Sequence, residues 1–345
     1  MTQSTSLAPP LARPRAAGRR TVLAALAVAI IAVLPLVVSP YWTTVATNAA
    51  LAFAIAAPLN LLTGNAGQFS LGNAAFLVVG AYTGAYVTFT FDLELPIAML
   101  AAAAAGALVG LIVGLPSLRL RGAYLLMSTL AAHYILVFAA LKFQTSQFGA
   151  AGAIFPPLRI AGVDLSGERS MYFVIAVFAA LIGLIIANIM RSGHGRALEA
   201  VKARDVAAAA CGISVARAKL WVWSLTSAMI AAAGVLQAYY LGSASVEYYT
   251  LNLAITYVAM ILVGGLGSLG GSLLGACFVT LVPVGVNHLS DAYGGEGGGI
   301  LAYPHELQTV IYGLIIIAFV LLKPDGLIGL VRSATDRVVR VRQGR

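Results

Sequence analysis

Residues 51–91, LAFAIAAPLNLLTGNAGQFSLGNAAFLVVGAYTGAYVTFTF, hold two apolar stretches on either side of a polar, glycine-rich stretch at residues 64–73. A transmembrane helix needs about 20 predominantly apolar residues. Residues 73–91 nearly supply them, and the first apolar stretch does so because it extends back to residue 41. Non-helical backbone at membrane depth is tolerated only where protein or a water-filled cavity satisfies its amides. The sequence therefore predicts a helical membrane protein, and residues 64–73, the first joint, are a candidate functional element.

The composition extends this pattern to the whole chain. Of its 345 residues, 60% are hydrophobic and only 10% are charged, whereas about 25% of the residues in a soluble domain are charged. We expect an all-α polytopic membrane protein of about ten transmembrane helices. The expected spans are residues 21–38, 41–62, 73–91, 95–114, 122–141, 171–190, 220–241, 251–266, 272–288 and 306–322.

The charges between these spans predict the topology. Arginine and lysine gather in residues 1–20, at Arg119 and Arg121, in residues 191–219 and after Lys323, whereas the segments between them hold mostly acids. Short basic loops stay in the cytoplasm, so ten crossings place both termini there. We expect disordered basic residues 1–20, a transmembrane permease domain at residues 21–330 and a basic tail at residues 331–345.

The net charge of +9 raises the question of nucleic-acid binding. The basic residues border apolar spans on one side of the membrane, as anchors to anionic lipid headgroups do. They do not form the basic patch of a nucleic-acid-binding domain. Membrane lipid is therefore an expected partner, and nucleic acid is not.

The first joint carries short polar side chains between two spans. Transporters use such breaks to present backbone groups and polar side chains to a substrate. A plain cytoplasmic turn is the alternative. The candidate substrate-pathway residues are Asn60, Asn65, Gln68, Ser70 and Asn73.

A second glycine-rich joint occupies residues 264–271, GGLGSLGG. It matches G-x-G-x-x-G but lacks the preceding strand and the acid about twenty residues later that a dinucleotide-binding turn needs. Both joints contain Ser-Leu-Gly, a hint of the internal repeats that many transporters have. The sequence leaves open whether either joint enters the membrane. The residues of interest are Gly264, Gly265, Gly267, Ser268 and Gly270.

Residues 191–219 form a third unusual segment on the cytoplasmic side. The segment is rich in alanine and charged residues and contains no proline. Alanine, glutamate, lysine and arginine are strong helix formers. We expect two short helices along the membrane face, bent at Gly212, that receive force from a soluble partner, with a solvated loop as the alternative.

Small residues recur every four positions in three spans. The sets are Gly80 and Gly84; Gly106, Gly110 and Gly114; and Gly271 and Gly275. This spacing places small residues on one helix face and lets neighbouring backbones approach closely. We expect tight helix packing at these positions.

Motifs for independent chemistry are missing from the sequence. There is no G-x-x-x-x-G-K-[ST], no H-E-x-x-H and no G-x-S-x-G, so neither P-loop ATP hydrolysis nor these hydrolytic mechanisms are expected. No acid lies in the middle of a span, where proton-driven carriers usually place one. We expect a transport protein that is not an enzyme, with no catalytic residue, metal or cofactor.

Five collinear motifs resemble those of a known family. They are residues 59–76 with Gly80-Ala81-Tyr82, residues 118–124, Gly195-Arg196-Ala197 through Gly212-Ile213, residues 263–271 and residues 323–329. Together they resemble LivM-type permeases, which are membrane subunits of ABC importers for branched-chain and other hydrophobic amino acids. The resemblance covers residues 45–330.

The resemblance implies a location and partners that composition does not. The chain is expected in the bacterial inner membrane beside a second, LivH-type permease. Two soluble ABC ATPase subunits are expected on the cytoplasmic face, where residues 191–219 are the coupling segment. A periplasmic or lipid-anchored substrate-binding protein is expected on the outer face.

The coupling residues follow from the importer pattern E-A-A-x-x-x-G. The pattern aligns with Val206-Ala207-Ala208 through Gly212, so the acid is absent at its usual place and Asp205 stands one position earlier. The expected coupling residues are Glu199, Asp205, Ala207, Ala208 and Gly212.

Two alternatives to hydrophobic amino-acid import stay open. Asn73 stands where family members often carry histidine, and Thr145-Ser146-Gln147 replaces a common Thr-Gly-Gly run. These departures allow urea or another small amide or carboxylate as cargo. A secondary carrier or a channel that works without ATPase partners is the second alternative.

Overall fold

The structure is a computed structural model that describes residues 39–160, 163–293, 310–311, 313–314, 317 and 326–329. The expected spans at 21–38 and 306–322 and both tails lie wholly or largely outside these residues. The helices are α2 (Pro40–Asn60), α3 (Asn73–Phe91), α4 (Leu95–Gly114), α5 (Ala123–Gln147), α6 (Glu168–Arg191), α7 (Gly193–Ala203), α8 (Asp205–Ala210), α9 (Val215–Leu241), α10 (Leu251–Gly264) and α11 (Leu269–Tyr293).

Within the described residues, eight helices are long and apolar enough to cross a membrane. They correspond to the eight expected spans between residues 41 and 288, so the all-α polytopic fold is confirmed. The expected span 122–141 ends too early, because α5 continues to Gln147. Turn-forming glycine first appears at Gly149, and nothing before it interrupts the helix.

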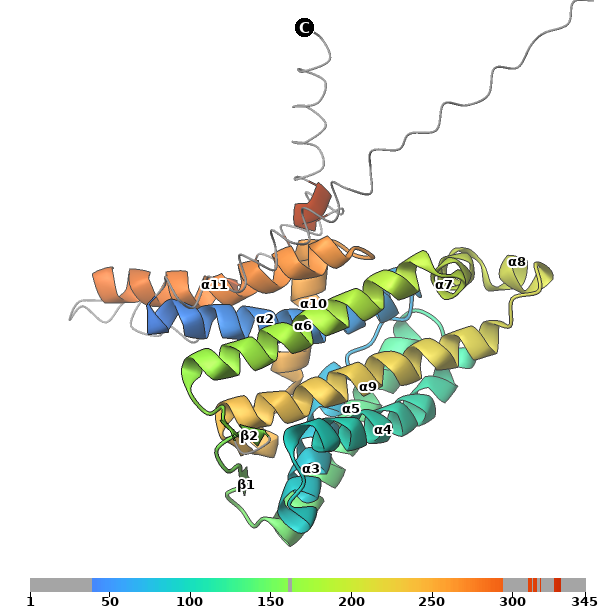
Figure 1. Cartoon of the computed structure of the whole chain (residues 1–345). Helices are drawn as coiled ribbons and strands as arrows, with labels where there is room; N and C mark the ends of the chain where they lie inside the picture. The colour runs from blue at the N-terminus through green and yellow to red at the C-terminus, as the bar shows by residue number, and fades with distance from the viewer. Residues whose placement is uncertain are drawn as a thin grey trace, which may run out of the picture.

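Short strands lie at the end of the bundle opposite α7 and α8 (Figure 1). β1 (Ala153–Ile154) pairs antiparallel with β4 (Ser243–Ala244), and β2 (Arg159–Ile160) pairs antiparallel with β3 (Val163–Asp164). The basic loops and the two joints lie at the α7–α8 end, which the distribution of positive charge predicts to be the cytoplasmic end.

Helix α9 packs tightly against α3 and α4 because glycines face it. A Cβ atom added at Gly80 would overlap the Ala231 carbonyl, and one added at Gly106 would overlap Ala231 and Ser227. Gly110 faces Ser227 in the same way. The expected close approach at the small-residue stripes is confirmed.

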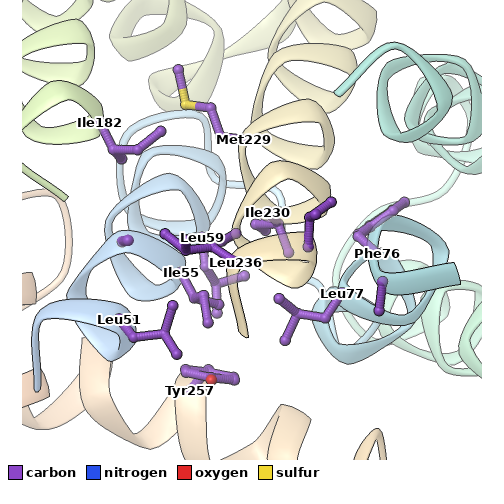
Figure 2. Packing of buried hydrophobic residues seen from close by; sticks show 14 of the residues in the cluster. Leu51, Ile55, Leu59, Phe76, Leu77, Ile182, Met229, Ile230, Leu236 and Tyr257 are labelled. Carbon is purple, nitrogen blue, oxygen red and sulfur yellow. The ribbon is translucent and has the colours of Figure 1, made fainter. Parts of the chain in front are cut away.

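The apolar core lies among helices that are distant in sequence. Figure 2 shows Leu51, Ile55 and Leu59 of α2 between side chains of α9 and α10, with Phe76 and Leu77 of α3 opposite. These side chains are among the most buried in the chain. The core therefore holds α2, the helix that leads into the first joint, in a fixed position.

We expect Gly106→Leu to lower the unfolding temperature by about 10 °C or more, or to prevent folding. The new side chain has no room beside α9, and overpacking costs roughly 1–3 kcal/mol or more. Gly285→Leu is the matched control, because a Cβ at Gly285 of α11 meets open space. Thermal unfolding in detergent, followed by size-exclusion fluorescence, measures both. Equal unfolding temperatures would contradict the packing described here.

Candidate functional site

Helix α2 changes its hydrogen bonding as it leads into the first joint. Leu61–Asn65 form a π-helical turn, η1, closed by the bond from the Ala66 amide to the Leu61 carbonyl at 3.1 Å. The chain is then non-helical until α3 begins at Asn73. Residues 61–66 are buried, so the joint is not a plain exposed turn. π-helical turns inside α-helices often mark functional sites.

Asn60 joins the first joint to the second. Its Nδ2 amide donates to the carbonyls of Gly265 at 3.2 Å and Ser268 at 3.1 Å. The same amide lies 2.8 Å from Ser272 Oγ, and Asn60 Oδ1 accepts from the Gly267 amide at 2.8 Å. Asn60 is 2% exposed, and both polar atoms of its side-chain amide are hydrogen-bonded to residues more than 200 positions away. The two joints are therefore one structural unit, which we call the paired joints.

The glycines of the second joint allow this contact. Gly265 and Gly267 have positive φ angles of 122° and 76°, which favour glycine. Gly64 faces the backbone of Gly267 so closely that a Cβ would overlap it. Asn65 Nδ2 adds a long bond, 3.4 Å, to the Gly267 carbonyl.

The remaining residues of the second joint begin α11. Ser268 Oγ accepts from the Gly271 amide at 3.0 Å, which caps the first turn of the helix. A Cβ at Gly264 would overlap the Gly271 carbonyl, and Gly270 lies against the Ile328 side chain. Backbone geometry and close packing thus account for these glycines.

Gln68 and Asn73 carry buried polar atoms without a partner. Gln68 Oε1 and both amide atoms of the Asn73 side chain have no hydrogen bond within the described part of the chain, and the residues are 6% and 1% exposed. Ser70 differs, because its Oγ accepts from the Gly72 amide at 3.1 Å. Buried polar groups are normally paired, so these orphaned atoms mark a place where water or a ligand completes the bonding.

Helix α5 supplies the wall beside the first joint. The Leu71 amide donates to Thr129 Oγ1 at 3.1 Å. His133, one helical turn further along α5, is buried, and its Nδ1 has no partner among the described residues. A polar stripe inside a membrane bundle is rare and typical of substrate pathways.

Residues 191–219 hold α7, α8 and the start of α9, and the expected break at Gly212 separates α8 from α9, whereas a further break was not expected. The helical path breaks at Arg204, whose φ and ψ are −161° and 116°, and this break separates α7 from α8. Gly212, with φ of 82°, lies just after α8, where a left-handed residue commonly ends a helix. The break at Arg204 brings the next residue, Asp205, to two cations.

Asp205 connects α8 to two other elements. Its Oδ2 lies 2.7 Å from Arg121 Nη2, in the loop before α5, and 2.9 Å from Lys219 Nζ on α9. The Arg121 side chain is 72% exposed, so that pair contributes little. The Lys219 side chain is only 4% exposed, and removing its partner would leave a buried charge unpaired.

Helix α7 contacts the first joint directly. Lys202 Nζ donates to the Gly64 carbonyl, so a charged side chain of the cytoplasmic segment holds the backbone of the paired joints. Glu199 and Ala207 are exposed, whereas Ala208 is buried. Val206 is 79% exposed and gives α8 an apolar outer surface beside Ala207.

The sequence alone missed several residues of this site. They are Arg121, Thr129, Lys202, Lys219 and Ser272. A signal existed for Lys219, a lysine in the first turns of an apolar helix, where an ion needs a partner. No local signal distinguishes Lys202 from other cytoplasmic lysines.

Comparison with known protein families identifies the family of this chain. Residues 41–320 match the family described as the permease component of the branched-chain amino acid transport system. The chain belongs to this family. The match covers every described membrane helix, both joints and the cytoplasmic segment.

Individual relatives of this permease agree with the family. The high-affinity branched-chain amino acid transport system permease protein LivM of Escherichia coli K12 is 27% identical over 327 residues, covering 86% of this chain and 72% of the relative. A probable LivH permease of Methanocaldococcus jannaschii is 28% identical over 298 residues, covering 82% and 89%. No solved structure matches. This permease is a multi-pass protein of the bacterial inner membrane.

Proposed function

We propose that this permease carries branched-chain or other hydrophobic amino acids into the cell as the membrane subunit of an ATP-driven importer. The family match over residues 41–320 is the observation that carries the proposal. The relatives named LivM and LivH support the cargo class. The chain has no P-loop motif of its own, so separate subunits hydrolyse the ATP.

Two soluble ATPases dock on the cytoplasmic segment, residues 191–219. The exposed surface of α8, with Val206 and Ala207, suits burial against such a partner. A LivH-type second permease completes the pathway, and a substrate-binding protein delivers cargo at the opposite end. The presence of both LivM and LivH relatives in one family supports a paired assembly.

Contacts of the cytoplasmic segment connect the surface where the ATPases dock to the paired joints. Motion of the ATPases shifts α8, which Asp205 joins to α9 through Lys219. Motion of α7 reaches the first joint through Lys202 and Gly64. Because Asn60 binds the second joint, both joints shift together and change access to the pathway.

Gln68 and Asn73 are the strongest candidates for contact with cargo, since their polar atoms are buried and unpartnered. We expect Gln68→Ala and Asn73→Ala each to slow leucine uptake about tenfold, the effect of losing one hydrogen bond worth roughly 1.4 kcal/mol. Gln147→Ala, at an exposed position at the end of α5, is the control. Unchanged uptake and cargo preference in both variants would end the pathway assignment.

Co-purification tests the importer assignment. Tagged permease is extracted from its host in mild detergent, and the chains that accompany it are identified. We expect P-loop ATPases and a second permease. Recovery of this chain alone, active in proteoliposomes without ATP, would instead establish a secondary carrier or a channel.

A further inference from the structure

Helix α5 is the least enclosed of the eight helices that can cross a membrane. Only 22% of its membrane-crossing stretch is buried, against 67% for α9 and 61% for α3. Among the described residues, α5 packs mainly against α3. Its other side presents Met127, Ala131, Tyr134, Phe138 and Leu141, all of them exposed. These residues are three or four positions apart and so share one helix face, which we call the open face of α5.

Tyr134 places a polar group of the open face deep in the membrane. It is 57% exposed and lies near the middle of α5, about 17 Å from the start of the helix at 1.5 Å per residue. The hydrocarbon core is about 30 Å thick, so the hydroxyl is too far from either headgroup layer to reach it. The hydroxyl has no hydrogen-bond partner within the described part of the chain. Tyrosine that contacts lipid belongs at the membrane interfaces, and an unpaired hydroxyl in hydrocarbon is unfavourable. Protein or water, not lipid, therefore covers this hydroxyl.

The exposed faces of α4 and α6 have a different composition, the one expected for contact with lipid. Residues 97–112 of α4 and 173–187 of α6 contain no polar side chain. Their exposed side chains include Leu100, Leu108 and Ile112 on α4 and Val177, Leu181 and Leu184 on α6. Helix α5 instead carries polar side chains on two sides, with Thr129 and His133 buried and Tyr134 exposed. A membrane helix with polar groups on two sides is covered on both by protein or by a water-filled pathway.

The position of the open face selects the kind of partner. Soluble proteins reach only the ends of a membrane span, so they cannot cover Tyr134. The opposite side of α5 contacts the first joint, where the Leu71 amide donates to Thr129 Oγ1 at 3.1 Å. A membrane chain on the open face would thus be separated from the first joint by a single helix. Ala131, a small exposed residue within the face, allows a partner helix to approach closely.

We infer that the open face of α5 is the surface on which the second, LivH-type permease docks. A membrane helix of that partner packs against Met127, Ala131 and Phe138, and a polar group of the partner forms a hydrogen bond with the Tyr134 hydroxyl. This inference rests on the proposed function, which includes a second permease but assigns it no surface. It places the contact between the two permeases beside the candidate pathway residues of the first joint.

Photo-crosslinking in the host tests the inference on the intact assembly. p-Benzoylphenylalanine replaces Met127 or Phe138 in the tagged permease, and it replaces Leu108 of α4 or Leu181 of α6 as a control at an exposed position. After ultraviolet irradiation the tagged chain is purified under denaturing conditions, and its adducts are identified by mass spectrometry. We expect an adduct with the second permease from both α5 positions and none from either control.

Two substitutions test the contact itself. Ala131→Trp adds a large side chain to an outward-facing position, so it should block the partner and reduce the second permease retained per tagged chain at least tenfold. Ala104→Trp, at an exposed position near the middle of α4, is the matched control and should retain it fully. Tyr134→Phe removes only the hydroxyl and should weaken retention about threefold, as is typical of one hydrogen bond between membrane helices. Size-exclusion chromatography of the tagged chain distinguishes loss of the partner from loss of the fold.

The outcomes separate this inference from the proposed function. If the second permease co-purifies with the wild-type chain but forms no adduct from α5, or if Ala131→Trp retains it fully in a folded protein, the docking surface is overturned and the importer stands. Adducts from α5 to a second copy of this chain, or to residues 306–322 of the same chain, overturn it in favour of another cover for the open face. If no second permease accompanies the wild-type chain, the paired assembly of the proposed function is itself rejected.

Discussion

Asn60→Leu is expected to reduce leucine uptake about 100-fold and to lower the unfolding temperature of the purified permease. The substitution removes four contacts at once, to two carbonyls, one hydroxyl and one amide of the second joint. Each buried group left without a partner costs roughly 1–3 kcal/mol. Together the orphaned groups favour separation of the paired joints, on which both packing and the pathway depend.

Two further variants test whether loss of the Asn60 amide contacts causes these defects. Asn60→Asp keeps the shape and the acceptor but loses the amide donor, and it turns a second oxygen toward the acceptors at Ser268 and Ser272. We expect it to be nearly as damaging as leucine. Asn252→Ala, at an exposed position near the start of α10, is the control. An Asn60→Leu protein that unfolds and transports like the wild type would mean that the joints hold together without this side chain.

Asp205→Ala is expected to uncouple ATP hydrolysis from transport. Leucine uptake by the reconstituted complex should fall at least tenfold while ATP hydrolysis continues, because α8 loses its link to α9. The variant also leaves the buried Lys219 ammonium unpaired. Breaking a buried pair costs on the order of 3 kcal/mol, and some of that is recovered here because Asp205 is partly exposed.

A double substitution separates stability from coupling. Asp205→Ala with Lys219→Met removes the orphaned charge and should restore the unfolding temperature, since an apolar pair replaces a buried ion pair at little cost. Uptake should stay low, because the ion pair between Asp205 of α8 and Lys219 of α9 is still missing. Glu247→Gln, at an exposed acid at the opposite end of the bundle, is the control. If the double variant recovered uptake fully, Asp205 would serve only to neutralise Lys219.

The helical spans were predictable because the signal for them is local. Length and apolarity alone gave α3 at residues 73–91 and α4 at residues 95–114 with their observed bounds. The glycine stripes predicted close packing but not the partner, and only the structure identifies α9 between Gly80 and Gly106. Pairing between helices depends on the whole bundle and has no signature within one stretch of sequence.

The sequence predicted which segments form the candidate site, namely the two joints and residues 191–219. It did not predict the contacts between them. Asn60 was expected to line a pathway, and the structure shows its side chain hydrogen-bonded to the second joint, 205 or more positions along the chain. A single sequence cannot show such a pairing. Glycine is a strong local break signal, and the break expected at Gly212 is present between α8 and α9. The further break at Arg204 has no such local signal, and the ion pairs of the next residue, Asp205, are tertiary contacts. Gln68 and Asn73 keep their candidate role.

Accumulation in proteoliposomes tests the importer most directly. This permease is reconstituted with the second permease, the ATPases and the binding protein that co-purify with it, with ATP on the ATPase side. Leucine should accumulate above its external concentration with hydrolysable ATP and fail to do so with a non-hydrolysable analogue. Accumulation driven by an ion gradient without ATPases, or equilibration without accumulation, would contradict the account and identify a carrier or a channel.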